Sequence, residues 1–268
     1  MENLTKKSVV VTGASGGLGK AVVNALKNEF NVFCLDLKPT DLNDKNVFDV
    51  FCDVTSETSV LDAYQEVLKH TKSIYAIIHT AGIYDLNSLI EVEEDKLQKI
   101  FEVNFFGAYR INKAFYKMLS KGSRIIMTTS ELAPLDPLPF TGIYAITKST
   151  LEKYAHSLRM ELSLKGIFVS VIRPGAIKTN LLGDSTRALD RFCQNTYEYP
   201  VNSKRFKNIV NSVESKCVEP KKIAKLIKKA TLIKKPRLTY NINRNFLLKL
   251  LNVLPKKLQL FIIKQILK

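Results

Sequence analysis

The sequence predicts an α/β domain in which helices cover both faces of a doubly wound parallel sheet. Short apolar segments with strand character alternate with segments of helical period, and this alternation is typical of parallel sheets. A chain of 268 residues is long enough for one such domain with a sizeable core. The expected strands are residues 8–11, 31–35, 47–51, 74–79, 124–129 and 168–172.

The first strand leads into a glycine-rich turn and then into a helical pattern. Four glycines, Gly13, Gly16, Gly17 and Gly19, occur within seven positions. Glycines let a backbone approach a pyrophosphate closely, and the free amides at a helix N-terminus favour its negative charge. The turn therefore predicts a phosphate-binding site.

Acidic residues close the second and third strands. Asp36 stands 23 residues after Gly13, where a carboxylate can accept hydrogen bonds from an adenosine ribose and repel a 2′-phosphate. Positions 14–16 carry no basic residue, so NAD(H) is expected rather than NADP(H), although the charge of Lys38 could partly offset Asp36. Asp53 follows the next strand, where the edge of an adenine could lie.

Tyr144 and Lys148 are four residues apart in a segment with helical character. That spacing places both side chains on one face of a helix. A neighbouring ammonium favours the phenolate, so we expect the pKa of Tyr144 to lie below its usual value near 10. A tyrosine tuned in this way is suited to general acid–base catalysis.

Six motifs, in this order, resemble those of the short-chain dehydrogenase/reductase family over about residues 7–182. They are the turn at 12–19, Thr80-Ala81-Gly82, Asn104, Ser130, Tyr144 with Lys148, and Arg173-Pro174-Gly175 with Thr179. The resemblance implies a Rossmann-like fold and hydride transfer between a nicotinamide dinucleotide and an alcohol or ketone. It also implies a homo-oligomer.

The resemblance assigns chemical roles to four residues. Tyr144 would be the general acid or base, and Ser130 would hydrogen-bond the substrate oxygen. Lys148 would hold the nicotinamide ribose and lower the pKa of Tyr144. Asn104 would order a water between Lys148 and solvent, and no metal is required. The residues expected to contact the cofactor are Gly13, Ser15, Gly16, Gly17, Leu18, Gly19, Asp36, Asp53, Val54, Thr80, Ala81, Gly82, Asn104, Tyr144, Lys148, Pro174, Gly175, Ile177 and Thr179.

Two positions depart from the family pattern. Thr80 replaces an asparagine that braces the central sheet, and its hydroxyl is expected to hydrogen-bond in a similar way. Ser130 precedes Tyr144 by 14 residues, one more than is common, and a proline-rich loop can absorb that residue. Glu131 would restore the common spacing, but its carboxylate would repel a developing alkoxide, so Ser130 is preferred.

The net formal charge of the chain arises entirely from its last quarter. Residues 203–268 contain 18 lysines and arginines and two acids, a net charge of +16, whereas residues 1–202 sum to zero. Part of this quarter resembles the closing segment of steroid- and retinol-dehydrogenase-like family members, with a strand at 236–240 before apolar and basic helices. Pro255 suits the first turn of the last helix.

The final segment, 246–268, is expected to be a basic amphipathic helical extension of a domain spanning 1–245. On its last helix Leu258, Ile262 and Ile266 share a face, and lysines line the opposite side. Three interpretations stay open: the helices cover the substrate cleft, they lie on an anionic membrane surface, or their charge is simply solvated. The first two are compatible.

The segment from about 180 to 211 has weak periodicity and lies where the family places its substrate lid, so we expect a mobile cover there. An apolar, bulky alcohol or ketone is the expected substrate, because the closing helices are apolar. Nucleic acid is disfavoured, since the basic tail has few interleaved aromatic residues.

The remaining signals favour a cytoplasmic enzyme. The four cysteines and three histidines have no metal-ligand spacing. The first strand begins within ten residues of Met1, and no uninterrupted apolar stretch reaches about 18 residues, so neither a signal peptide nor a spanning helix is expected. The alternative is a nucleotide-bound regulatory or scaffold protein without turnover, which loss of Ser130, Tyr144 or Lys148 would indicate; all three are present.

Overall fold

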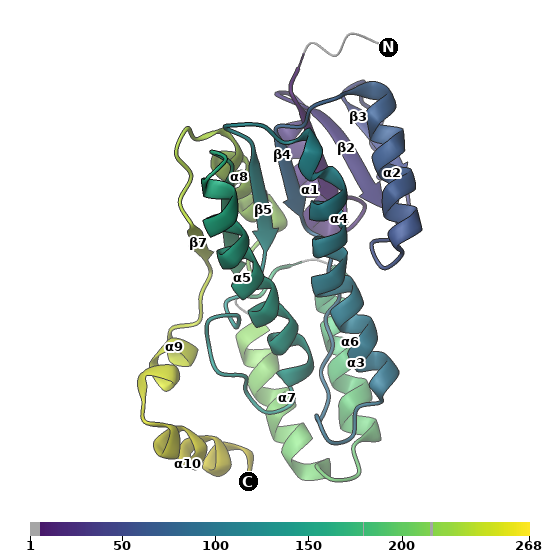
Figure 1. Ribbon diagram of the computed structural model, residues 1–268. Coiled ribbons are helices and arrows are strands. Elements are labelled where there is room, and N and C mark those ends of the chain that lie inside the picture. The colour runs from purple at the N-terminus through teal and green to yellow at the C-terminus, as the bar shows by residue number, and fades with distance from the viewer. Residues whose placement is uncertain (1–5, 179, 215–216) are drawn as a thin grey trace.

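A seven-stranded parallel sheet forms the centre of the computed structural model, which describes residues 6–178, 180–214 and 217–268 (Figure 1). The strand order is β3-β2-β1-β4-β5-β6-β7, and each neighbouring pair is parallel. The strands are β1 (Ser8–Thr12), β2 (Asn31–Asp36), β3 (Val47–Phe51), β4 (Ala76–His79), β5 (Arg124–Thr128), β6 (Phe168–Pro174) and β7 (Thr239–Ile242). The order reverses between β1 and β4, which confirms the predicted doubly wound sheet.

The predicted strand bounds agree with the structure to within about three residues. The fourth strand begins at Ala76 rather than at residue 74, and the sixth continues to Pro174. The closing strand, expected at 236–240, lies at Thr239–Ile242 and pairs with β6. The carboxyl ends of the strands, where ligands bind in such sheets, lie within two residues of their predicted positions.

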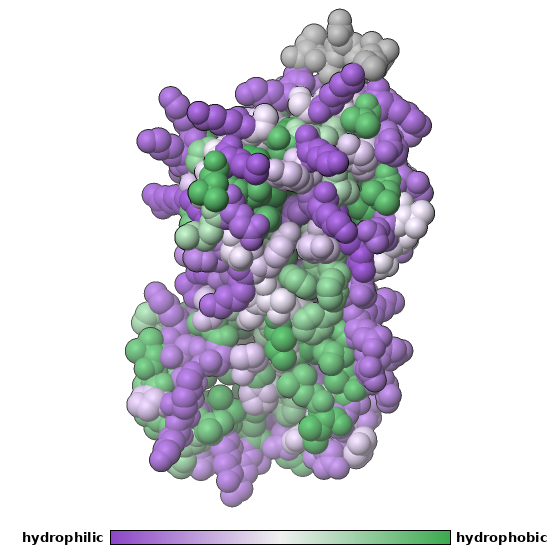
Figure 2. All heavy atoms as spheres, in the orientation of Figure 1, coloured by the Kyte–Doolittle hydropathy of each residue, from purple (hydrophilic) through white to green (hydrophobic). Residues whose placement is uncertain are grey.

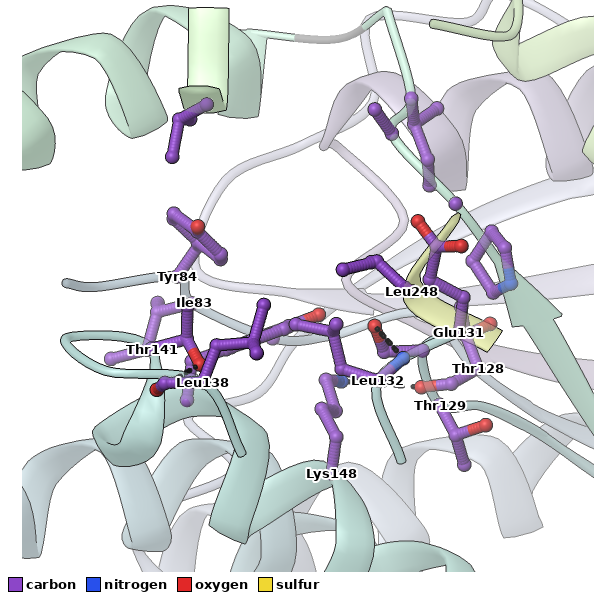
Figure 3. A pocket seen from close by; sticks show the side chains of 18 of the residues that line it. Ile83, Tyr84, Thr128, Thr129, Glu131, Leu132, Leu138, Thr141, Lys148 and Leu248 are labelled. Carbon is purple, nitrogen blue, oxygen red and sulfur yellow. Dashed lines mark hydrogen bonds between the residues drawn. The ribbon is translucent and has the colours of Figure 1, made fainter. Parts of the chain in front are cut away.

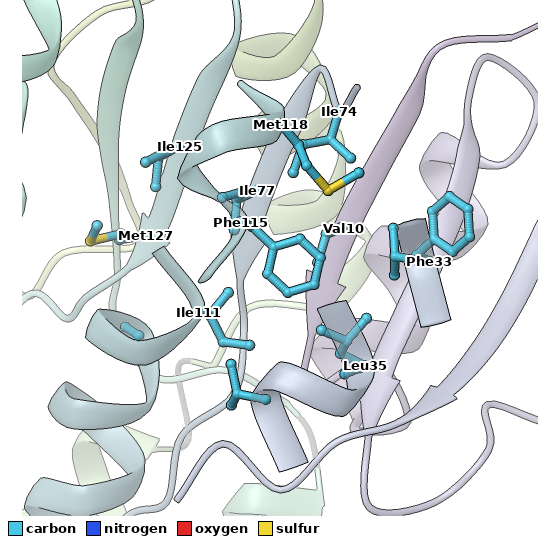
Figure 4. Packing of buried hydrophobic residues seen from close by; sticks show 14 of the residues in the cluster. Val10, Phe33, Leu35, Ile74, Ile77, Ile111, Phe115, Met118, Ile125 and Met127 are labelled. Carbon is cyan, nitrogen blue, oxygen red and sulfur yellow. The ribbon is translucent and has the colours of Figure 1, made fainter. Parts of the chain in front are cut away.

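Alternate side chains of the strands enter two separate cores. Val10 faces the core that contains Phe33 and Phe115, whereas Val9 and Val11 face the other (Figure 4). The first core lies under α2 (Glu57–His70), α4 (Gly107–Phe115) and α5 (Gly142–Ser163), and the second lies under α1 (Gly17–Leu26) and α8 (Pro220–Leu232). Both faces of the sheet are therefore covered by helices, as predicted.

A long helical stretch leads from the carboxyl edge of the sheet back toward its amino edge (Figure 1). α3 (Glu94–Phe101) continues through a π-helical turn, η1 (Glu102–Phe106), into α4, which ends in the short 3₁₀ turn η2 (Tyr116–Met118). The π-helical turn inserts one extra residue per turn, and such turns are frequent at functional sites. It reorients the side chains of residues 102–106 relative to a regular helix.

The segment expected as a lid forms two helices, α6 (Asn180–Asn195) and α7 (Pro200–Glu214). A third apolar cluster holds them to the rest of the chain, and it contains Leu86, Phe140, Leu189, Phe192, Phe206 and Leu267. The weak periodicity of this segment therefore did not reveal that it forms two regular helices. Apolar spacings at Ala188, Leu189 and Phe192, and at Phe206, Ile209 and Val210, are the helical signal that could have identified it.

The C-terminal segment forms α9 (Phe246–Val253) and α10 (Lys256–Leu267), which lie at the lower left of Figure 1. Pro255 stands just before α10, as its position in the sequence predicted. On α10, Gln259, Ile263 and Leu267 are turned toward the body of the molecule, whereas Leu258 and Ile266, which belong to the predicted apolar face, are exposed. The choice of face depends on the contact with α7, which no local pattern reveals.

Within the described residues, no helix has the length and apolar character needed to cross a membrane. That same part of the chain also contains no group of three or more His, Cys, Asp or Glu side chains placed to hold a metal ion. All four cysteines are free thiols, and Cys34 and Cys52 are buried.

Candidate active site

The glycine turn between β1 and α1 is shaped by contacts that admit no side chain. Gly13 has a φ of +66°, and a Cβ there would lie 2.5 Å from the amide nitrogen of Ala81. A Cβ on Gly19 would lie 2.0 Å from the carbonyl oxygen of Gly13. The turn therefore packs backbone against backbone, and the first-turn amides of α1, at Gly17 and Leu18, lack intrahelical partners. This cradle fits a pyrophosphate.

Asp36 lies at the carboxyl end of β2, beside the glycine turn. One carboxylate oxygen accepts a hydrogen bond from the amide of Ser15 at 2.9 Å, and the other accepts from the amide of Leu37 at 2.7 Å. These bonds fix the carboxylate against the turn that would hold the pyrophosphate.

Asp53 and Val54 follow β3 and are fixed by local contacts. Asp53 accepts hydrogen bonds from the amide and hydroxyl of Thr55 at 2.9 and 2.7 Å. Val54 packs so tightly on α4 that a Cβ added to Gly107 would lie 2.8 Å from its side chain. These residues form the wall on the β3 side of the turn.

Thr80 ties the end of β4 to the end of β1. Its hydroxyl donates to the carbonyl oxygen of Thr12 at 2.6 Å, which confirms the expectation that a threonine can brace the sheet here. Gly82 follows, and a Cβ at this position would lie 3.2 Å from the Asn104 Oδ1 and 3.3 Å from the Lys148 Nζ. The Thr80-Ala81-Gly82 segment therefore passes directly over two of the predicted catalytic side chains.

Ser130, Tyr144 and Lys148 converge at the carboxyl edge of the sheet. Ser130 follows β5, and the other two residues share one face of α5 as their spacing predicted. A hydrogen bond joins the side chains of Ser130 and Tyr144. The Nζ of Lys148 lies 5.7 Å from the centre of the Tyr144 ring and donates to the carbonyl oxygen of Thr128 at 3.2 Å. The three groups thus form one cluster.

The expected direction of the Tyr144 pKa shift is wrong for this protein environment. Burial raises the pKa of Tyr144 to about 12, and the hydrogen bond with Ser130 offsets only part of that shift. Burial also lowers the pKa of Lys148 to about 8. The removal of water from both groups outweighs the attraction that the spacing suggested. At neutral pH Tyr144 is consequently a phenol that can donate a proton.

Asn104 lies within the π-helical turn η1 and faces the loop after β4. Its Oδ1 accepts from the amide of Ile83 at 2.8 Å, and its Nδ2 donates to the Ile83 carbonyl at 3.0 Å and to the Thr147 hydroxyl at 3.0 Å. The residue is buried. The side chain therefore holds the loop beside Lys148.

Pro174, Gly175 and Ile177 leave β6 on the opposite side of the cluster. A Cβ on Gly175 would lie 1.9 Å from the carbonyl oxygen of Asn243, so this turn also requires glycine. Ile177 forms an isolated parallel bridge with Val218. Thr179, which was expected to contact the nicotinamide, lies outside the described residues.

A cavity of about 240 Å³ opens above the Ser130, Tyr144 and Lys148 cluster. Figure 3 shows Ile83 and Tyr84 on one side of it and Glu131 and Leu248 on the other. Its walls are mostly apolar. The expected lid contributes Phe206, Ile209 and Val210, and the C-terminal segment contributes Leu248. The sequence reasoning did not single out the other members: Ile83, Tyr84, Leu132, Leu138 and Thr141. They come from loops and helices remote in sequence, so only the tertiary fold brings them together.

Glu131, which was considered and rejected as the partner of Tyr144, makes its contacts with the C-terminal segment instead. Its Oε2 accepts a hydrogen bond from the amide of Asn245 at 2.5 Å, and burial raises the pKa of its carboxyl. Asn245 is the residue that caps α9. Glu131 therefore connects the end of β5 to the C-terminal helices.

The sequence model of the short chain dehydrogenases matches residues 7–190. An uncharacterized oxidoreductase, YbbO, of Escherichia coli strain K12 is 36% identical over 180 residues, which are 65% of this chain and 67% of that protein. An NADPH-dependent 1-acyldihydroxyacetone phosphate reductase of Schizosaccharomyces pombe is 31% identical over 205 residues, 73% of this chain and 69% of its own. Estradiol 17-beta-dehydrogenase 2 of Mus musculus is 31% identical over 66% of this chain but only 50% of its own length.

Solved structures give the same fold at lower identity. A short chain dehydrogenase family protein of Francisella tularensis superposes with a TM-score of 0.74 at 20% identity, covering 89% of this chain and 97% of its own. An alcohol dehydrogenase of the archaeon Thermococcus sibiricus, complexed with 5-hydroxy-NADP, gives a TM-score of 0.71 at 22% identity over 88% of this chain and 96% of that one.

This protein belongs to the short-chain dehydrogenase family. It is accordingly an oxidoreductase of the class that acts on alcohols and ketones with a nicotinamide dinucleotide.

Proposed function

We propose that the protein interconverts an apolar alcohol and its ketone with NAD(H), using Tyr144 as the general acid or base. One observation carries the proposal: the hydrogen-bonded pair of Ser130 and Tyr144 lies at the polar end of a mostly apolar cavity, beside a glycine turn that fits a pyrophosphate. The dinucleotide, when bound, supplies or accepts the hydride.

The protein's part is to manage the proton and the charge on the substrate oxygen. In ketone reduction the Tyr144 hydroxyl donates its proton to the oxygen, and Ser130 donates a second hydrogen bond to the same oxygen. In alcohol oxidation the proton moves the opposite way. The high pKa of Tyr144 keeps the phenol protonated until a neighbouring positive charge favours the phenolate.

Lys148 and Asn104 act behind this pair. Lys148, with a pKa lowered to about 8 by burial, is close to the pH at which it can exchange protons with solvent. Asn104 and Lys148 both approach Gly82, which supports a water held between them. Such a water would return a proton to Tyr144 after each turnover.

The preference for NAD(H) rests on Asp36. Its carboxylate is held against the glycine turn by the amide of Ser15, and a negative charge there disfavours a 2′-phosphate. The yeast relative is NADPH-dependent, and the archaeal structure contains an NADP derivative, so both dinucleotides must be compared directly. We expect NAD(H) to bind more tightly than NADP(H), because positions 14–16 contain no basic residue that could pair with a 2′-phosphate.

The substrate class follows from the cavity walls. Leucine, isoleucine, valine and phenylalanine side chains surround the space above Tyr144, and these favour a bulky apolar group attached to the carbinol carbon. Two relatives are named for estradiol and for 1-acyldihydroxyacetone phosphate, which agrees with a substrate larger than a simple alcohol.

Cytoplasmic localisation and a homo-oligomeric state complete the proposal. Cell fractionation and sedimentation equilibrium test these two points separately from catalysis.

The decisive experiment compares Tyr144→Phe with Tyr154→Phe, the same chemical change on the same helix but outside the residues that line the cavity. Calorimetric titration with NAD⁺ and NADP⁺ gives the Kd values, and a panel of apolar alcohols and ketones gives kcat. Tyr144→Phe should lower kcat at least about 100-fold and leave the NAD⁺ Kd nearly unchanged. Lys148→Ala should damage both quantities.

Tyr154→Phe should retain kcat within about threefold, because it loses only a hydrogen bond with Asn112. Wild-type turnover in Tyr144→Phe would show that the mechanism is wrong. Tighter binding of NADP⁺ than of NAD⁺ would reverse the cofactor assignment without affecting the role of Tyr144.

A further inference from the structure

Helix α9 is apolar on two opposite sides. Leu248 faces inward and lines the cavity. The outward side has the spacing of one helical face, and its residues are between 50% and 78% exposed: Phe246, Leu247, Leu250 and Val253. Three of these four side chains are more than half exposed, although contact between apolar surface and water is unfavourable. Because α9 already packs on the body of the molecule through its inward side, the exposed apolar side indicates a contact with something outside the described chain.

Helix α10 also exposes apolar residues. Ile263 and Leu267 face α7; Leu258 and Phe261 are exposed on the side away from α7, and Leu260 and Ile266 are exposed on the flanks of the packed side. Phe261 is 58% exposed and stands almost opposite Ile263 and Leu267 on the helix. In Figure 2 hydrophobic groups gather with hydrophilic ones over the region of α9 and α10, at the lower left of the view.

Contacts with the body of the molecule fix the orientation of α9 and α10. The amide of Asp136 donates to the Asn252 Oδ1 at 2.8 Å, and the same aspartate forms an ion pair with Lys256. At the other end, the Asn202 Nδ2 donates to the carbonyl oxygen of Leu267 at 2.6 Å. The two helices are therefore docked at both ends, and their exposed residues form a fixed surface.

The charges on this surface have one sign. Residues 246–268 contain five lysines and no acid. Lys249, Lys257, Lys264 and Lys268 are exposed beside the apolar residues, while Lys256 is the one paired with Asp136. Apolar side chains surrounded by cations are the composition of a helix that lies in the plane of an anionic lipid interface.

A second copy of the chain fits this surface poorly. A symmetric contact through α9 and α10 would place the same lysines of two protomers against one another, with no acid in the segment to offset them. A bilayer rich in anionic lipid offers both an apolar layer and negative headgroups. No helix among the residues that the structure describes can span such a layer, so the contact is at its surface.

We propose that the outward side of α9 and α10 docks on an anionic membrane surface. Leu247 would then enter the interface while its neighbour Leu248 lines the cavity wall. The width of a single helix would separate lipid from the candidate substrate pocket. The docking itself does not depend on the proposed catalytic activity.

The test is co-sedimentation of the full-length protein with vesicles of phosphatidylcholine alone and of phosphatidylcholine with 30 mol% phosphatidylserine, a composition of about one-third anionic lipid. Binding to the anionic vesicles alone is expected. It should weaken as salt rises from about 0.1 M to 1 M, because the Debye length falls from about 10 Å to about 3 Å.

Paired variants separate this surface from general hydrophobicity. Leu250 and Phe261 are 50% and 58% exposed, and Leu61 and Met160, on α2 and α5, are 48% and 64% exposed. The double variant Leu250→Gln/Phe261→Gln should reduce vesicle binding about tenfold, whereas Leu61→Gln/Met160→Gln should not change it. Lys257→Gln/Lys264→Gln should also reduce binding about tenfold, against Lys72→Gln/Lys165→Gln as the control.

Three results would overturn the proposal: no binding to either vesicle, equal binding to both, or equal losses in the matched pairs. A further alternative is that Leu250→Gln/Phe261→Gln changes the sedimentation mass and not vesicle binding. That result would make the surface a contact between copies of the chain. Because these positions are exposed in the monomer, circular dichroism and melting should show that every variant is folded.

Discussion

The family-matching part of the chain and its last quarter form the same cavity by different physical means. Residues 1–202 carry no net charge, and their predicted site residues are held by backbone contacts and buried hydrogen bonds. Residues 203–268 carry a net charge of +16 and contribute apolar side chains, such as Phe206 and Leu248, from amphipathic helices. Backbone contacts in the first region leave little room for substitution. In the second region, side chains that line the cavity can be replaced without displacing Ser130, Tyr144 or Lys148.

This difference predicts that substitutions in the two regions have different kinds of effect. Changes around the glycine turn or the sheet core should alter folding and cofactor binding. Changes in the C-terminal helices should alter the affinity for an apolar substrate or a lipid surface, with folding intact.

The largest effect is expected for Gly19→Ala. Its Cβ, whose place is fixed by the backbone of α1, would lie 2.0 Å from the carbonyl oxygen of Gly13, a backbone atom that cannot move aside. We expect a loss of about 3 kcal/mol in the free energy of unfolding, the upper range for overpacking, together with the loss of NAD⁺ binding. Urea unfolding and calorimetry measure the two effects.

Gly16→Ala is the matched control in the same turn. Its φ is −71°, and an added Cβ would lie 3.4 Å from the Gly13 carbonyl, an ordinary contact. The free energy of unfolding should change by less than about 1 kcal/mol. Similar stabilities for the two variants would refute the idea that backbone packing fixes this turn.

The next effect concerns His79, which ends β4 in the buried centre of the first region. Burial lowers its pKa to about 4, although its Nε2 lies 2.9 Å from the Asn112 Oδ1 and that hydrogen bond favours the charged form; the charge of Lys148 adds to the lowering. The unfolded chain takes up the proton near pH 6.5, so between pH 6.5 and 4 it binds more protons than the folded chain. Stability is full above this window and falls as the pH drops.

Wild-type protein should lose about 2 kcal/mol more than His79→Gln between pH 7 and pH 5. Urea unfolding at the two pH values gives this difference, and other titrating groups cancel between the two proteins. Parallel losses would mean that His79 takes up its proton in the folded state and that the core there is open to water.

The fold and much of the candidate site were readable from the sequence because they depend on local patterns. Strand and helix periods, the glycine turn and the spacing of Tyr144 and Lys148 are all short-range signals. The bond from the Thr80 hydroxyl to Thr12 was likewise predictable, since the substituted side chain kept a donor at the same point.

The remaining features depend on burial and on contacts distant in sequence. The direction of the Tyr144 pKa shift was wrong because spacing reveals the neighbouring charge but not the loss of water. The buried face of α10 could not be predicted, because the contact with α7 that selects Ile263 and Leu267 joins segments distant in sequence. The connection from Glu131 to Asn245 spans 114 positions and has no local signature.

The smallest effect separates two adjacent leucines of the last quarter. Leu248 lines the cavity, whereas Leu247, about 100° away around α9, is 71% exposed. Leu248→Ala removes apolar contact from a bound substrate and should raise KM about fivefold, near 1 kcal/mol, with kcat and the NAD⁺ Kd unchanged. Leu247→Ala should leave KM unchanged in a lipid-free assay and weaken vesicle binding instead. Steady-state kinetics with and without anionic vesicles gives both readouts for both variants. Equal effects of the two substitutions on KM would mean that α9 acts as a unit rather than through one wall residue, and the division between a pocket side and a lipid side of this helix would have to be abandoned.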